Sequence, residues 1–140
     1  MSTEPEYSAR IREHFRAPRN AGSFPRELAV LCGRAGARRH GREVMFQLRL
    51  ASDGRIRECR YRVYGCPATI ALCSIASEAL QGRPLAEAAA YSVLALADEL
   101  GLPAEKRDAA LTIEDAIRSA VRRYNAPQRP QSAVTQVQQV

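Results

Sequence analysis

The chain lacks the features that would place it in a membrane or outside the cell. It has no run of about 18 apolar residues, the length that a membrane-spanning helix needs. The segment Met1–Arg10 is polar and has no apolar stretch of the kind that a secretory signal carries. The four cysteines form no C-x-x-C pair. We therefore expect a soluble, cytoplasmic protein whose thiols are reduced.

The usual marks of an independent enzyme are missing as well. The sequence has no paired carboxylates at a catalytic spacing and no glycine-rich phosphate loop. It contains two histidines, and neither stands at a predictable place beside a nucleophile. We predict a binding or carrier protein whose chemistry is completed by a partner.

Positive charge is abundant, with 21 Lys and Arg against 15 Asp and Glu and a net charge of +6. Nearly all of it is arginine, spread from Arg10 to Arg129 without an aromatic RNA-binding motif. This dispersion favours a solvated surface, or one that suits an acidic protein partner, over a nucleic-acid site. A basic nucleic-acid module stays open as the least favoured alternative, and it predicts binding that falls steeply with salt.

The length of 140 residues suits one domain with its own core. We expect this domain to span residues 1–125 and residues 126–140, rich in Gln and Pro, to form a flexible tail. The predicted helices are Tyr7–Phe15, Pro67–Leu80, a short one opened by Pro84, Ser92–Leu100, and a last one capped by Thr112.

Alternating apolar residues predict a hairpin from Val44–Leu50 and Cys59–Val63, turned at Ser52-Asp53-Gly54 and buried on one face. Leu28–Cys32 adds a third strand. The stretch 33–41, with its glycines and arginines, is interpreted as a mobile loop.

The tetrad Tyr64-Gly65-Cys66-Pro67 places a thiol on a tight turn between a strand and a helix. The helix that begins at Pro67 directs free N–H groups and the positive end of its dipole at Cys66, which favours thiolate over thiol. Such a thiolate suits sulfur transfer or metal ligation. The alternative is a small buried apolar residue that takes no part in chemistry.

A series of motifs, in order and at similar separations, resembles the U-type iron-sulfur cluster scaffold family (IscU, the NifU N-terminal domain and SufU). The resemblance covers about Tyr7 to Tyr124. It rests on Tyr7-Ser8, His14, Pro18-Arg19-Asn20, Gly22-Ser23-Phe24, Asp53-Gly54, Tyr64-Gly65-Cys66, Ile70-Ala71, Gly82, Leu102-Pro103, Lys106 and Glu114-Asp115-Ala116-Ile117. It implies an α+β fold in which helices pack on one face of a three-stranded antiparallel sheet.

In this family three cysteines and an aspartate meet at one end of the domain, take sulfur from a cysteine desulfurase and build a transferable cluster. Cys66 falls on one of these cysteines and is implied as the sulfur acceptor. His40 falls on another ligand, Arg42 on the aspartate, and Asp108 and Ala109 on a late His-Cys pair. The implied ligands of an iron-sulfur cluster, or of a Zn or Fe ion, are Cys66, His40 and Asp108. Asp108 has a second interpretation, in which it only favours the N-terminal end of the last helix.

The remaining cysteines are assigned by position. Cys73 lies on the same helical face as Cys66 but about two turns away, roughly 10 Å, so we expect it in the core. Cys59 lies on the inward face of its strand. Cys32, just before the predicted mobile loop, is the candidate auxiliary thiol.

The resemblance implies a scaffold or carrier that passes clusters to recipient iron-sulfur proteins. The alternative is a metal- or zinc-binding pseudo-scaffold that docks or regulates a cysteine desulfurase without building a cluster. The segment Leu102–Lys106 resembles one that an Hsp70-type chaperone recognises in the family. Glu105 places a charge in a segment that would enter an apolar groove, so we expect that binding to be weak.

Overall fold

The structure is a computed structural model that describes residues 7–25 and 29–125. Leu28 at the start of the predicted third strand and the predicted tail at 126–140 lie outside the described residues. The elements in chain order are α1 (Ala9–Arg16), β1 (Val30–Ala37), the 3-10 helix η1 (Arg38–His40), β2 (Arg42–Leu50), β3 (Ile56–Tyr64), α2 (Pro67–Leu80), α3 (Leu85–Ala90), α4 (Val93–Glu99), the 3-10 helix η2 (Ala104–Lys106) and α5 (Arg107–Asn125).

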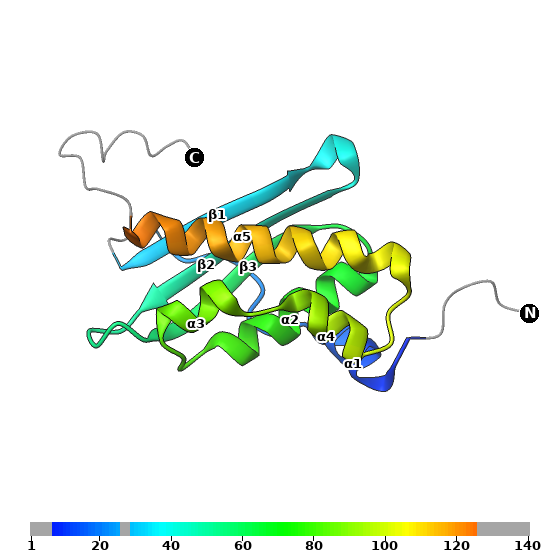
Figure 1. Ribbon diagram of the computed structural model, residues 1–140, viewed down its shortest axis with the longest axis horizontal. Helices are drawn as coiled ribbons and strands as arrows, with labels where there is room; N and C mark the ends of the chain where they lie inside the picture. Colours follow the sequence, from blue (N-terminus) through cyan, green and yellow to red (C-terminus); the bar gives the residue numbers. More distant parts are fainter. Residues whose placement is uncertain (1–6, 26–28, 126–140) are drawn as a thin grey trace, which may run out of the picture.

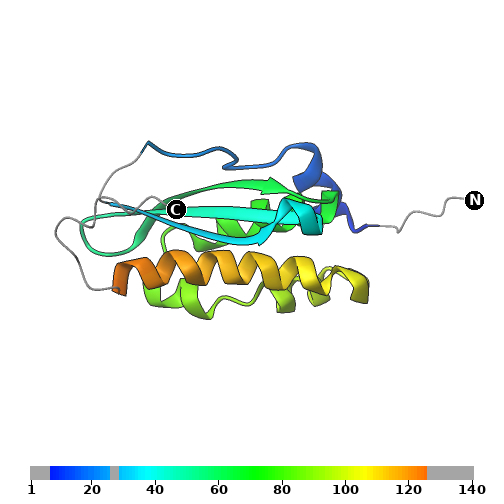
Figure 2. The same cartoon turned by 90° about the horizontal axis from the view of Figure 1, so that it is seen from above.

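The three strands form one antiparallel sheet in the order β1-β2-β3. The helices α2 to α5 lie together on one face of this sheet (Figures 1 and 2). In the middle of the register Phe46 pairs with Gly33 on one side and Tyr61 on the other, so the three residues share the face that the helices cover. The predicted α+β fold is confirmed.

The core lies between this face of the sheet and the helices. Phe46 and Tyr61 are buried there, with ring centroids 5.9 Å apart. α2 is buried along most of its surface, and small residues such as Ala71 and Ala76 have no exposed area. A helix that is apolar nearly all round belongs inside the protein, and small side chains let the sheet and α5 approach it closely.

The opposite face of the sheet is not simply solvated, so the prediction of a single buried face is wrong for β2. The chain after α1, over residues 17–25, passes over this face (Figure 2). There the Phe24 N–H donates to Gln47 Oε1 at 2.7 Å, and the guanidinium groups of Arg49 and Arg60 lie over the Phe24 ring. Gln47 and Met45 are buried although they point away from the helices, and Gln47 is the residue that accepts the Phe24 N–H.

The predicted mobile loop at 33–41 is also wrong, because β1 continues to Ala37 and only η1 and Gly41 form the turn. Gly33 serves the packing of α5 on the sheet. A Cβ at this position would lie 2.1 Å from the Ala116 carbonyl oxygen and 2.3 Å from the Ala120 nitrogen. Sequence alone favoured a loop because glycine clusters mark loops more often than close backbone packing.

The predicted bounds of α2, Pro67–Leu80, are confirmed. α4 has Ser92 as its N-cap, whose hydroxyl accepts the Ala95 N–H. The predicted cap of the last helix is wrong, because α5 begins at Arg107. Thr112 lies inside it and donates its hydroxyl to the Asp108 carbonyl one turn earlier, a bond that threonine also makes within helices.

α1 differs from its predicted apolar side. It begins after Ser8, which caps it by accepting the Ile11 N–H. Ile11 is fully buried, but Phe15 is 44% exposed. The second buried side chain of α1 is that of His14.

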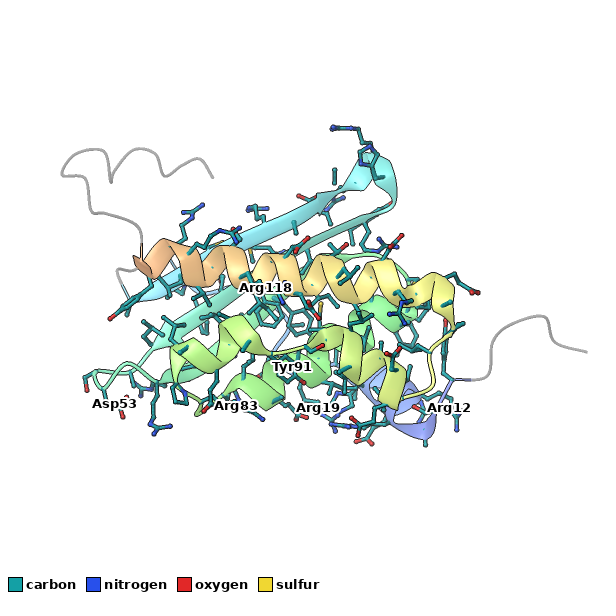
Figure 3. The ribbon with its side chains drawn as sticks, in the orientation of Figure 1. Arg12, Arg19, Asp53, Arg83, Tyr91 and Arg118 are labelled. Atoms are coloured by element: carbon teal, nitrogen blue, oxygen red, sulfur yellow. The ribbon has the colours of Figure 1, made fainter. Side chains whose placement is uncertain are left out.

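Buried Glu114 ties α4 to α5. Its carboxylate accepts the Leu94 N–H at 2.9 Å at the start of α4 and the Arg118 guanidinium at 3.0 Å. Arg118 also donates to the Ala89 carbonyl of α3, in the middle of the view in Figure 3. Figure 3 also shows Asp53 of the hairpin turn and Arg12 of α1 at opposite ends of the molecule. In the described part of the chain, no helix is both long and apolar enough to cross a membrane.

Candidate functional site

Cys66 lies at the junction between β3 and α2. Its backbone is extended, and its carbonyl accepts the N–H groups of Thr69 and Ile70 to begin the helix. Gly65 leaves room for the neighbouring side chain, since a Cβ there would come within 3.2 Å of Thr69. The Tyr-Gly-Cys-Pro pattern thus brings Thr69 against the thiol.

Side chains from two segments that are distant in sequence, the start of α2 and η2, meet at this thiol. The Thr69 hydroxyl lies 3.3 Å from Cys66 Sγ. The Lys106 Nζ of η2, 40 residues later in the chain, lies 3.5 Å from the same sulfur. The Tyr7 side chain, just before α1, lies close enough to Lys106 to stabilise its positive charge. Cys66 is half-buried, so it has a fixed environment and stays accessible.

This environment favours the thiolate. Partial burial by itself raises the pKa of Cys66, but hydrogen bonds to the side chain and backbone of Thr69 and the charge of Lys106 outweigh it, and the pKa lies below its ordinary value. Burial disfavours the charge of Lys106, yet the pKa of Lys106 is raised because Cys66 and Tyr7 stabilise the ammonium. Each group of this pair therefore favours the charged form of the other.

The other cysteines have different environments. Cys59 and Cys73 are fully buried, as predicted. Burial raises the pKa of Cys59 to about 12 and that of Cys73 further still. Cys32 lies on β1 in register with Gln47, and β2 separates it from β3. Cys32 is therefore part of a strand and not next to a mobile loop, and the described structure does not bring its thiol to Cys66.

The other predicted ligands do not gather at Cys66. His40 is exposed on η1, and Asp108 is exposed in the first turn of α5. No three His, Cys, Asp or Glu side chains within the described ranges lie close enough to hold a metal ion. Asp108 lies in the first turn of α5, where a carboxylate interacts favourably with the positive end of the helix dipole. This is the position expected if Asp108 only stabilises the start of the helix.

Exposed apolar side chains also lie on elements that begin or end near Cys66. Tyr64, two residues before it, is 47% exposed and lies under the guanidinium of Arg38, 4.9 Å from the ring centroid. Leu111 of α5 is 41% exposed. Of the two, Tyr64 lies beside an arginine, and aromatic residues and arginine are both enriched at protein interfaces.

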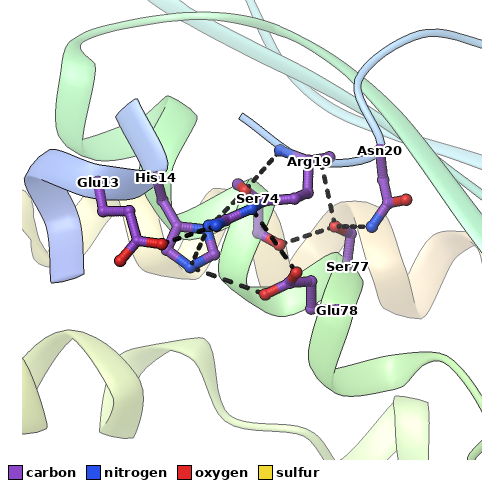
Figure 4. A network of polar contacts seen from close by, with 7 residues as sticks. All are labelled: Glu13, His14, Arg19, Asn20, Ser74, Ser77 and Glu78. Atoms are coloured by element: carbon purple, nitrogen blue, oxygen red, sulfur yellow. Dashed lines mark hydrogen bonds and ion pairs between the residues drawn. The ribbon is translucent and has the colours of Figure 1, made fainter. Parts of the chain in front are cut away.

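His14 is a buried polar residue whose environment could not be predicted from sequence. Its side chain is 4% exposed and contacts Ser74 of α2 through Nδ1 at 2.7 Å. The Arg19 guanidinium lies 3.0 Å from Nε2 and is itself paired with Glu13 at 2.7 Å. Figure 4 shows this network, which joins α1 and the following segment to α2 through Ser77 and Glu78 as well.

Comparisons with known proteins agree with this geometry. Residues 6–131 match the family described as NifU-like N terminal domain. The "Iron-sulfur cluster assembly scaffold protein IscU" of Haemophilus influenzae is 34% identical over 123 residues, 87% of this chain and 98% of that protein. The chain belongs to the NifU-like N-terminal domain family.

Further members resemble the chain over most of its length. The "Iron-sulfur cluster assembly protein 2" of Arabidopsis thaliana is 36% identical and covers 91% of this chain and 78% of its own. The crystal structure of a nitrogen-fixing NifU-like protein (N-terminal) from Brucella abortus shares the fold, with a TM-score of 0.64 at 17% identity over 84% of this chain and 92% of that one. The family resemblance predicted from the motifs is thereby confirmed.

Sequence reasoning identified Cys66 within this NifU-like domain but not its two partners. Cys66 is the N-cap of α2 and Thr69 follows it by one helical turn, so the sequence could have indicated that these two side chains are neighbours. Lys106 was noted as part of Leu102–Lys106, and no sequence pattern connects it with a thiol 40 residues away.

Proposed function

We propose that the protein acts in iron-sulfur cluster assembly as a scaffold or carrier, with Cys66 as the group that takes up sulfur or iron. Its relatives carry names that state cluster assembly. The observation that carries the proposal is the environment of Cys66. The Lys106 ammonium lies against its sulfur and its pKa is lowered, whereas burial raises the pKa of Cys59 and of Cys73. The protein is not an enzyme but presents this thiolate to others.

The number of ligating side chains near Cys66 limits how one chain can hold a cluster. A cluster iron needs several thiolate, imidazole or carboxylate ligands. Within the described residues no such group of three lies together. We propose that ligands from a second molecule, another copy or a recipient protein, complete the coordination of the cluster. His40 and Asp108 remain predicted accessory ligands, and they would act only after η1 and the start of α5 move toward Cys66.

The partners follow from the same assignment. A cysteine desulfurase would supply sulfur, and recipient iron-sulfur proteins would accept the cluster, both at the end that carries Cys66. Exposed Tyr64 and Leu111 fit such contacts. A cytoplasmic location stays a prediction from the sequence.

Chaperone binding at Leu102–Lys106 is a weaker proposal. The side chain of Lys106 is engaged with Cys66, so a chaperone that took this segment would also release the thiol from its cation. The acidic Glu105 in the middle of the segment is exposed and would oppose entry into an apolar groove.

The alternative, a zinc-binding pseudo-scaffold that regulates a desulfurase, is not favoured. The relatives are named as assembly proteins. Structural zinc requires about four ligands in one place, and no group of three is found in the described ranges.

The test is anaerobic reconstitution with ferrous iron and sulfide. We expect thiolate-to-iron absorption bands, with iron and sulfide bound to the chain. Cys66→Ser should abolish the bands, whereas Cys32→Ser should keep them because Cys32 lies two strands away from β3. A colourless wild-type protein, or bands that survive in Cys66→Ser, would contradict the proposal.

A further inference from the structure

A groove lies beside β3, an outer strand of the sheet, where the chain after α1 crosses it. We call residues 17–25, which form one wall of this groove, the strap. The groove has a volume of about 380 Å³, which is within the range of ligand pockets. Its lining is mainly apolar and comes from the strap, from β3 and from the first turn of α2; it includes Pro18, Ala21, Gly22, Arg62, Val63 and Ile70. Apolar groups that line an open groove can bind another molecule.

The strap is fixed to the rest of the domain, so the groove belongs to the folded protein. Asn20 Nδ2 donates to Ser77 Oγ of α2 at 2.9 Å (Figure 4). Ala21 forms a parallel bridge with Tyr61 of β3, in which the Gly22 N–H donates to the Tyr61 carbonyl at 2.9 Å. The strap thus covers the edge of β3 as far as Tyr61.

Beyond the strap, the edge of β3 has unpaired backbone groups. The register of β3 with β2 is regular from Glu58 to Tyr64. In such an antiparallel pair, every second residue directs both its N–H and its C=O away from the partner strand. Because the Tyr61 carbonyl is directed outward at Gly22, the two backbone groups of Val63 are directed outward as well. Within residues 7–25 and 29–125 neither group has a hydrogen-bond partner. A free strand edge of this kind is a template for a further strand.

Arg62 is the charged residue of the groove, and its guanidinium is not used by the domain. It is exposed, and it makes no hydrogen bond, ion pair or ring contact with the described part of the chain. Its neighbour on the same face of β3, Arg60, is instead paired with Glu58 at 3.7 Å and lies over the Phe24 ring. A carboxylate of another molecule could therefore bind Arg62 without breaking an existing ion pair.

We propose that the groove beside β3 binds an extended acidic segment of a partner protein, which adds a strand to the sheet at Val63. This binding role goes beyond the proposed cluster function and does not depend on it. Successive residues of a strand point to opposite faces, so Arg62 presents a cation on one face while Val63 presents apolar surface on the other, with Ile70 also lining the groove. The segment that fits alternates acidic with apolar residues. Backbone hydrogen bonds provide the affinity of such an added strand, and the alternate side chains provide its specificity.

A second copy of the chain fits this edge less well. Symmetric pairing of two β3 strands would bring Arg60 and Arg62 of both chains to one strand pair, and like charges across a strand pair are destabilising. An acidic segment instead complements Arg62, in a chain whose net charge is +6. Charge complementarity therefore favours an acidic partner.

The experiment begins with a random library of phage-displayed peptides, selected on the immobilised protein without iron or sulfide. We expect enriched sequences that alternate Asp or Glu with aliphatic or aromatic residues. An enriched peptide is then labelled with fluorescein and titrated by fluorescence anisotropy against wild type, Ile70→Asp and Arg62→Gln. Arg57→Gln is the matched control, because Arg57 is an exposed arginine of the same strand that does not line the groove.

Ile70→Asp should weaken binding of the peptide at least tenfold, because it replaces an apolar contact by a charge that repels the acidic peptide. Arg62→Gln should weaken it about twofold to fivefold, the range that one exposed ion pair supports, and this difference should shrink in high salt. Arg57→Gln and Cys66→Ser should bind like wild type. Ala21→Asp, at an exposed position of the strap, is the second groove variant if Ile70→Asp does not fold.

Hydrogen exchange of the Val63 amide tests the added strand directly. This N–H is free in the unbound protein, so it should exchange about tenfold more slowly at a peptide concentration ten times the Kd. The Arg62 N–H, which is directed at β2, is the internal control and should not change.

Three results would overturn the proposal: a selection that enriches no acidic and apolar alternation, equal peptide binding by wild type and the groove variants, or unchanged exchange of the Val63 amide in the complex. Sedimentation of the unloaded protein tests the second copy, and a dimer that Ile70→Asp dissociates would assign the groove to another chain instead. Cluster formation by a protein that binds no such peptide contradicts this role alone. Peptide binding by a protein that forms no cluster contradicts only the scaffold function.

Discussion

At the scale of single residues, the environment decides which thiol is reactive. Cys66 and Cys73 lie at the start and in the middle of the same helical segment, yet their pKa values are shifted in opposite directions. Cys73 is surrounded by the core, where a thiolate would have no solvation and no partner. Cys66 has Thr69 and Lys106 against its sulfur, and these contacts more than offset its partial burial.

His14 is the second residue whose properties depend on its neighbours. Burial and the nearby charge of Arg19 lower the pKa of His14 below its ordinary value, against the opposing effect of Glu78 and Glu13. Arg10 on the same helix also lowers it. The neutral imidazole therefore belongs to the folded state, where it bridges Ser74 and Arg19.

The first prediction concerns pH and His14. In the unfolded chain the imidazole takes up a proton near its ordinary pKa of 6.5, whereas in the folded protein it does so only at lower pH. Below about pH 6.5 the unfolded state binds more protons, so the free energy of unfolding falls as pH falls through this window. Urea unfolding from pH 7.5 to pH 5 should show this loss of stability.

His14→Gln is the control for this prediction, because glutamine keeps a polar side chain but does not titrate. The variant should have a flatter pH dependence than wild type between pH 6.5 and pH 5. Equal slopes for the two proteins would show that His14 is not the group responsible.

At the scale of elements, the contact between β1 and α5 determines the shape of the domain. α5 lies along the sheet with its backbone close to Gly33, which is why β1 tolerates no side chain at that point. α5 starts at Arg107, directly after η2. The position of α5 therefore also determines which groups the Lys106 side chain can contact. The packing of one long helix thus connects the core to the functional site.

The second prediction is that Gly33→Ala destabilises the protein by about 3 kcal/mol or more, because the added Cβ meets backbone rather than a movable side chain. Gly41→Ala is the control. Gly41 has φ +87°, and a Cβ added there would have nothing within 4 Å, so only its left-handed backbone opposes the change, at about 1 to 2 kcal/mol. Urea unfolding midpoints measure both, and equal losses would mean that β1 and α5 do not pack as closely as described.

At the scale of the whole molecule, the functional groups lie at one end. Cys66, Lys106 and Tyr7 meet at the end where β3 finishes and α5 begins, opposite the hairpin turn at Asp53 (Figures 1 and 3). The thiol of Cys66 lies there, and its pKa is lowered. A site that offers one thiol ligand at an end of the molecule suits a cluster that is shared between two molecules.

The third prediction follows from this arrangement. Protein loaded with iron and sulfide in the absence of small thiols should sediment at about twice the mass of the unloaded chain, since a second copy must supply further ligands. Cys66→Ser should stay at the unloaded mass under the same conditions. Loaded wild-type protein that keeps the mass of one chain would show that a single chain holds the cluster, and that His40 or Asp108 can reach it.

Local signals in the sequence were enough to predict the strands of the hairpin, the bounds of α2, the family and the position of Cys66. These signals are alternation, helix-start residues and a short ordered series of motifs, and each is visible without knowledge of the fold. The start of α5 escaped this reasoning because Thr112 and Asp115 form a pattern that occurs inside helices as well as at their ends.

What surrounds the thiol depends on tertiary packing. Lys106 is 40 residues from Cys66 in the chain, and His14 and Ser74 are 60 residues apart. Their contacts arise when helices pack on a sheet, and no local preference encodes them. The same packing placed Cys32 on β1, apart from Cys66, and gave Gly33 its role against α5. Local sequence thus determines where the candidate thiol lies, whereas the groups that surround it depend on the fold as a whole.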